Sequence, residues 1–71
     1  MIKLNCIEEM CPIPIIKLKA ELEKGTPQFI IVTDHNCTVT AVEDYLTILK
    51  LYYIIEEVIS GIWEITVFNE K

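Results

Sequence analysis

The chain has 71 residues, of which 52% are hydrophobic and 24% are charged. This length suits one domain with a single core, and the apolar fraction is too high for a disordered chain, so we expect it to fold without metal or disulfides. The formal net charge is −5, with eleven acidic residues against six lysines and no arginine. That balance argues against a nucleic-acid backbone as a partner.

Apolar runs such as residues 13–16 and 29–32 are much shorter than the roughly 20 residues of a membrane-spanning helix. Residues 1–5 lack the basic region and the long apolar stretch of a signal peptide. We therefore expect a cytoplasmic protein that does not insert into a membrane.

The three cysteines are Cys6, Cys11 and Cys37. An odd count excludes a complete disulfide framework within one chain. The sequence also contains no C-x-x-C pair, and His35 is the single histidine, so we expect neither a structural zinc site nor another metal or cofactor.

Residues 2–6 alternate in hydropathy, which predicts a strand whose apolar face includes Cys6. Cys6 is therefore expected in the core. A helix is predicted over 12–24, because Pro12 and Pro14 fit the first turn, where a missing N–H costs nothing. Gly25 should end this helix.

Within that helix, Ile15, Leu18 and Leu22 follow helical spacing and predict the buried stripe. Ile16 is expected to widen the stripe, and Glu21 is expected to face water.

The run 29–32 is β-branched and aromatic, which predicts a central strand. Helical spacing of apolar residues predicts a second helix over 38–49. Two further β-rich segments, 52–59 and 62–68, are separated by a turn at 60–61 and predict a hairpin.

The element order is therefore βαβαββ in a single domain spanning 1–71. It predicts an α/β (α+β) two-layer sandwich, in which both helices lie on one face of a four-stranded mixed sheet. If the first two strands run parallel, both helices begin at the same edge of the sheet. The starts of the two helices, at Cys11 and Cys37, would then be neighbours.

Cys11 precedes the helix that begins at Pro12, where free N–H groups and the helix dipole favour a thiolate. We expect the pKa of this thiol to be lowered, although Glu8 and Glu9 place negative charge on the approaching loop. The alternative is an inert cysteine that merely caps the helix.

The stretch Cys11-Pro12-Ile13-Pro14, which follows a short strand, resembles the C-P-x-P motif of the TusA/SirA/YedF/YeeD-like sulfur-carrier family. The resemblance implies that Cys11 accepts sulfane sulfur as a persulfide and passes it to a partner. It implies a sulfur carrier or accessory sulfurtransferase rather than a stand-alone enzyme. The expected donor is a cysteine desulfurase or rhodanese-like protein, and the expected acceptor is a protein thiol.

Segments 34–38 and 61–67 are similar to the corresponding regions of YeeD-like members. Because YeeD-like proteins are associated with a membrane thiosulfate importer, this similarity implies thiosulfate as a candidate sulfur source and the importer as a candidate partner. The chain departs from the family at Asn5 and Glu8, where an Asp-x-x-Gly approach is usual. Its acidic loop and lack of arginine also argue against a role in transfer-RNA thiolation.

Cys37 has three possible roles, as a resolving thiol, a second sulfur relay point, or a core residue at a helix start. His35 could hydrogen-bond a sulfur oxyanion or help to deprotonate a thiol, or it could be a solvated turn residue beside Asp34 and Asn36. Four strand aromatics are interpreted as sheet packing or a docking patch: Tyr52, Tyr53, Trp63 and Phe68.

Two other functions compete with sulfur relay. Cys11 and Cys37 could form a redox-active disulfide, which requires their Cα atoms to lie within about 7 Å. Alternatively, the domain could be a regulatory module that binds a protein through its sheet, with the thiol incidental.

Overall fold

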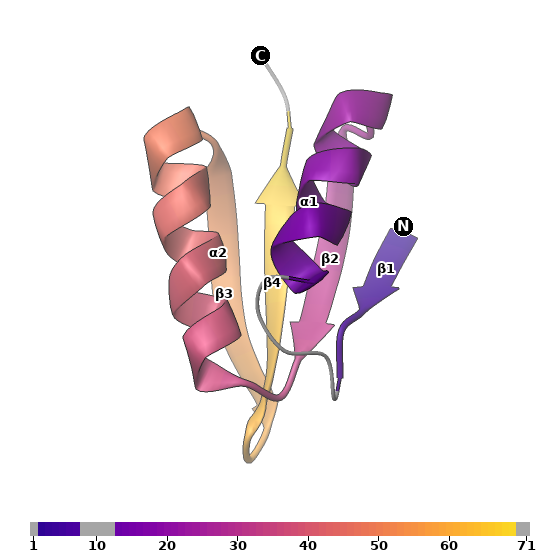
Figure 1. Cartoon of the computed structure of the whole chain (residues 1–71). Coiled ribbons are helices and arrows are strands. Elements are labelled where there is room, and N and C mark those ends of the chain that lie inside the picture. The colour runs from indigo at the N-terminus through magenta and orange to yellow at the C-terminus, as the bar shows by residue number, and fades with distance from the viewer. Residues whose placement is uncertain (1, 8–12, 70–71) are drawn as a thin grey trace.

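A computed structural model describes residues 2–7 and 13–69. Its elements follow the predicted order (Figure 1). They are β1 (Ile2–Asn5), α1 (Ile13–Lys24), β2 (Gln28–Thr33), α2 (Asn36–Leu49), β3 (Tyr52–Ile59) and β4 (Ile62–Phe68).

The four strands form one mixed sheet in the order β1-β2-β4-β3. β1 pairs with β2 in parallel, and β4 pairs with both β2 and β3 antiparallel. Both helices lie against the same face of this sheet (Figure 1). The predicted two-layer sandwich, the mixed sheet and the parallel first pair of strands are therefore confirmed.

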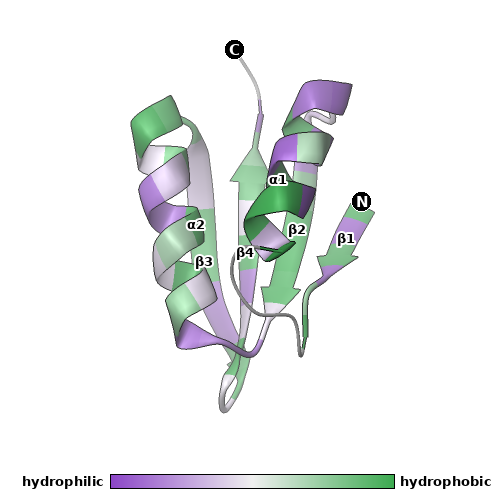
Figure 2. Cartoon of the chain, viewed as in Figure 1, coloured by the Kyte–Doolittle hydropathy of each residue, from purple (hydrophilic) through white to green (hydrophobic). Residues whose placement is uncertain are grey.

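β2 lies between β1 and β4, as its apolar run predicts. Its side chains alternate, so that Phe29, Ile31 and Thr33 are fully buried whereas Ile30 and Val32 are half-buried. The buried set faces the helices, because strand side chains point to opposite faces in turn. Figure 2 shows the hydrophobic character of this central strand beside the hydrophilic segment that leads into α2.

The core is built from the helix-facing side of the sheet and the inner sides of the helices. Cys6 is fully buried within it, which confirms the core position expected for this thiol. The buried apolar cluster consists of Cys6, Leu18, Phe29, Ile31, Val39, Val42, Leu46, Ile65 and Val67.

The buried stripe of α1 differs from the prediction. Pro14, Leu18 and Glu21 are buried, whereas Ile16 is 60% exposed. The prediction was wrong for Ile16 and Glu21, because Pro14, Leu18 and Glu21 follow a 4-then-3 spacing that turns Ile16 outward. Glu21 is accommodated because its carboxylate accepts hydrogen bonds from Thr26 Oγ1 at 2.8 Å and Lys24 Nζ at 3.0 Å.

The predicted end of α1 is confirmed. Gly25 has φ +80°, and its N–H donates to the carbonyl of Leu22 at 3.1 Å. The second helix begins at Asn36, two residues earlier than the predicted Thr38. His35 is its extended N-cap residue, with φ −110° and ψ 121°.

Candidate functional site

The edge at which the parallel strands β1 and β2 end is the region of interest. Both α1 and α2 begin there, as the parallel pairing predicts (Figure 1). Cys11 and Pro12 lie outside the described residues, as do Glu8 and Glu9. The geometry of this edge is therefore given by the residues on either side of that segment.

Pro14 is the second residue of α1, and its side chain is buried. At this position the missing N–H has no partner to lose within the helix, so proline fixes φ at little cost. Ile13 and Ile16 remain largely exposed on the same first turn. The start of α1 thus combines one proline anchored in the core with outward apolar side chains.

Asn5 shapes the chain as it leaves β1. Its Oδ1 accepts a hydrogen bond from the N–H of Ile7 at 3.1 Å, which is the contact of an Asx turn. The N–H of Cys6 donates to the carbonyl of Val32 at 2.7 Å, which holds this exit against β2.

The start of α2 is ordered by backbone contacts. The carbonyl of His35 accepts hydrogen bonds from the N–H groups of Thr38 at 3.1 Å and Val39 at 3.2 Å. The N–H of His35 donates in turn to the buried Thr33 Oγ1 at 3.2 Å. Thr33 therefore couples the end of β2 to the helix start. The sequence alone did not predict this role, because it depends on the position of the His35 N–H in the fold.

Cys37 lies in the first turn of α2 and is exposed. Its neighbours Thr38 and Val39 are buried, so the helix turns this thiol outward. The exposure excludes the interpretation of Cys37 as a core residue. It leaves the two chemical roles open.

The His35 imidazole is half-buried and lies beside Asp34, with Nδ1 2.8 Å from the carboxylate Oδ1. The pair is an ion pair only when the imidazole is protonated. The His35 side chain makes no capping hydrogen bond to α2. Asn36 is the first residue of the helix, and its carbonyl accepts a hydrogen bond from Thr40 Oγ1.

Trp63 joins this edge from the other half of the chain. It pairs with Thr33 across β2 and β4, and it packs against the core half-buried. The start of segment 61–67 therefore lies beside the start of segment 34–38, although more than twenty residues separate the two segments in the sequence. Only the pairing of β4 with β2 brings them together.

The four strand aromatics divide between the two faces of the sheet. Tyr53 pairs with the buried Val67 on the helix-facing side, where its hydroxyl donates to Glu43 Oε2 at 3.3 Å. Tyr52 and Phe68 pair with each other on the opposite side. Tyr53 and Trp63 thus act in packing, whereas Tyr52 is 82% exposed.

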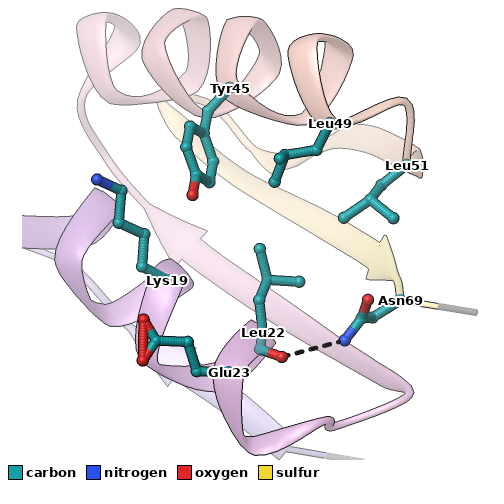
Figure 3. Close-up of a pocket in the computed structure, with 7 residues that line it drawn as sticks. All are labelled: Lys19, Leu22, Glu23, Tyr45, Leu49, Leu51 and Asn69. Carbon is teal, nitrogen blue, oxygen red and sulfur yellow. Dashed lines mark hydrogen bonds between the residues drawn. The ribbon is translucent and has the colours of Figure 1, made fainter.

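A groove of about 500 Å³ lies at the other end of the molecule, between the later turns of α1 and α2 (Figure 3). Its lining is Lys19, Leu22, Glu23, Tyr45, Leu49, Leu51 and Asn69. The Asn69 side chain lines one end of the groove and donates to the carbonyl of Leu22 at 3.4 Å (Figure 3). The groove is separate from the edge that carries Cys37, because it lies at the C-terminal ends of α1 and α2, whereas Cys37 lies at the N-terminal end of α2.

Within residues 2–7 and 13–69, no three His, Cys, Asp or Glu side chains gather as metal ligands would. None of the helices in the same ranges is long and apolar enough to cross a membrane.

Comparison with known proteins identifies the relatives of this chain. The family model described as sulfurtransferase TusA matches residues 2–68. The crystal structure of a SirA-like protein from Desulfitobacterium hafniense superposes with a TM-score of 0.88 over 100% of both chains, at 20% sequence identity, a likeness that concerns the fold. No curated protein matches the chain. The match to nearly the whole length shows that this chain belongs to the sulfurtransferase TusA family.

Proposed function

We propose that this protein is a sulfur carrier that accepts sulfane sulfur on Cys11 and passes it to an acceptor thiol. Membership of the TusA family, over residues 2–68, is the observation that carries the proposal, and it supports a role in sulfur relay through partner proteins. Only Pro12 separates Cys11 from the first residue of α1, so we expect the thiol close to that helix start. The free N–H groups there favour a thiolate.

The transfer is an exchange between sulfur atoms. The Cys11 thiolate attacks the outer sulfur of a donor persulfide, a new S–S bond forms, and the donor departs as a thiolate. With thiosulfate as the donor, the S–S bond of thiosulfate breaks, Cys11 keeps the outer sulfur as a persulfide anion, and sulfite departs. In the second step, an acceptor thiolate attacks the outer sulfur of the Cys11 persulfide and releases Cys11 as a thiolate.

Two features support thiosulfate as one donor. Segments 34–38 and 61–67 are similar to YeeD-like proteins, and Trp63, near the start of the second segment, pairs with Thr33 directly before the first. Exposed Cys37 lies in the first turn of α2 at that edge and could act as a second relay point. We propose His35, half-buried beside it, as a hydrogen-bond donor to the sulfur oxyanion.

The test is intact-protein mass spectrometry after exposure to a persulfide-charged cysteine desulfurase and, separately, to thiosulfate. We expect an adduct of one sulfur atom that reductant removes and that is absent from Cys11→Ala. Cys37→Ala is the matched control, because it removes an exposed thiol from the same edge. Retention of the full adduct in folded Cys11→Ala would contradict the proposal.

The exposure of Cys37 also favours a second candidate, a dithiol that forms a disulfide with Cys11. Two-electron oxidation would remove both thiols, and the oxidant would take up the electrons. Thiol titration after mild oxidation distinguishes the candidates, since the redox function predicts the loss of two reactive groups without dimer formation. The relay function predicts a sulfur adduct without that loss.

A further inference from the structure

The face of the sheet that turns away from α1 and α2 has no covering layer within the described residues. Cross-strand pairing identifies its members, because paired residues point to the same face. One row contains Lys3, Ile30, Thr66 and Ile54. The next row contains Asn5, Val32, Glu64 and Glu56, and rows at the two ends contain Gln28, Phe68 and Tyr52, and Ile62 and Ile59.

This open face is apolar over much of its area. Ile30, Val32 and Phe68 are half-buried, while Ile54 is 51% exposed and Ile59 is 66% exposed. A contiguous apolar surface of this kind, bordered by polar residues, marks an interaction site more often than isolated exposed side chains do. The open face is therefore suited to binding a partner through apolar side chains.

The charges on the same face define the chemistry of that partner. Glu56 lies directly opposite Glu64 across β3 and β4. Lys3 Nζ reaches Glu64 Oε2 at 3.6 Å, whereas Glu56 forms no ion pair within the described residues. Like charges that face each other across two strands repel. A basic side chain placed near Glu56 would therefore attract this carboxylate and offset its repulsion from Glu64.

A second copy of this chain is a poor complement to the face. The chain carries a net charge of −5, and the exposed edge strand β3 presents Glu56 and Glu57. A register irregularity between Glu57 and Ile59 interrupts the regular pairing pattern of this strand. Charges and irregularities on an edge strand oppose pairing between copies. Anionic lipid and nucleic acid are disfavoured by the same negative charge.

We propose that the open face docks a helix of a partner protein whose apolar side chains are bordered by lysine or arginine. A helix packed there would give the sheet a second helical layer, which is the usual way in which both faces of a sheet are covered. The apolar side chains would cover Ile30 and Ile54, and a basic residue would face Glu56. This proposal does not depend on the sulfur chemistry of the opposite layer.

The proposal is tested by amide NMR titration of the full chain with a synthetic amphipathic helical peptide that carries leucine on one face bordered by lysine. We expect shifts confined to β4, β3 and β2 residues of the open face, and about tenfold weaker binding by Glu56→Lys. Ile54→Glu should also weaken binding. Ile48→Glu is the matched control, because Ile48 is 75% exposed on α2 and its replacement should leave the affinity unchanged.

Three outcomes would overturn the proposal. The first is absence of binding, or shifts that map to the helices instead of the sheet. The second is equal affinity for a matched peptide in which glutamate replaces lysine. The third is a concentration-dependent dimer in sedimentation that is lost in Ile54→Glu, because that result would assign the face to a second copy.

Discussion

The two faces of the sheet come from the same strands but meet different surroundings. On β2, Ile31 is fully buried under the helices, whereas its neighbour Ile30 is half-buried on the open side. On β3, likewise, Tyr53 on the helix-facing side is half-buried, whereas Tyr52 on the open side is exposed. One face therefore holds the apolar contacts that stabilise the fold, and the other leaves side chains available for a partner.

The surroundings of carboxylates also differ between the two sides of the sheet. Glu21, a buried residue of α1, is only 7% exposed in its side chain and accepts hydrogen bonds from Thr26 and Lys24. Glu56, on the open face, lies opposite another glutamate. On the covered side, neighbouring donors satisfy the charge of Glu21. On the open side, Glu56 forms no ion pair within the described residues.

The largest predicted effect compares neighbours on β2. Ile31→Ala should lower the free energy of unfolding by about 3 kcal/mol, because it leaves a cavity in the core. Ile30→Ala should cost about 1 kcal/mol, since less apolar area is lost from a half-covered site. Urea unfolding of the two variants gives both values, and equal losses would show that the open face is covered in the free protein.

The adjacent tyrosines of β3 provide the next comparison. Tyr53→Ala should cost about 2 kcal/mol, because the ring packs against the core and its hydroxyl donates to Glu43. Tyr52→Ala should cost less than about 0.5 kcal/mol, because its side chain is exposed. Thermal unfolding followed by circular dichroism would measure both, and a larger loss for Tyr52 would contradict the assignment of faces.

Acid titration examines the carboxylate on the covered side. The hydrogen bonds from Thr26 and then Lys24 hold the pKa of Glu21 below its ordinary value. A lowered pKa in the folded state stabilises the protein above the unfolded pKa, and this contribution is lost as the pH falls through the folded value. The stability difference between wild type and Glu21→Gln should therefore be largest near neutral pH and shrink below about pH 4.3.

Thr26→Val serves as the control for this titration, because it removes the main hydrogen-bond donor and leaves the carboxyl in place. It should weaken the acid dependence without abolishing it. Denaturant unfolding at a series of pH values measures both variants. A stability difference that does not change with pH would exclude the network around Glu21 as its cause.

The smallest effects are expected at the paired glutamates. Glu56→Gln should raise the free energy of unfolding by about 0.5 kcal/mol, because it removes the repulsion from Glu64, and the gain should shrink in high salt. Glu57→Gln should give no such gain, because the Glu57 carboxylate accepts the N–H of Gly61 at 2.9 Å. Denaturant unfolding of both variants at low and high salt measures these effects. A lower free energy of unfolding in Glu56→Gln would refute the predicted repulsion.

Much of the fold was predictable because local patterns agree with it. The bounds of β3 and β4 follow the β-rich runs 52–59 and 62–68, since Gly61 with φ +83° sits in the turn between them. The end of α1 followed from Gly25 for the same reason. The start of α2 was predicted two residues late, because His35 caps the helix through its backbone and its side chain gives no capping signal.

The candidate site was predictable only in part. Sequence order and the parallel pairing of β1 and β2 brought the two helix starts to one edge. The exposure of Cys37 could not be read from the sequence, because it depends on which side of α2 packs against the sheet. Thr33 and Trp63 were missed as partners at this edge, because their contact arises from the register between β2 and β4.

The sequence by itself determined the kinds of element, their order, the burial of Cys6 and the resemblance that pointed to sulfur relay, since each depends on residues close together in the chain. The tertiary structure alone decided that Glu21 is covered and Ile16 exposed, and that Glu56 faces Glu64. These features depend on how helices rotate against the sheet and how distant strands align. Both are set by packing of the whole core, which no single segment encodes.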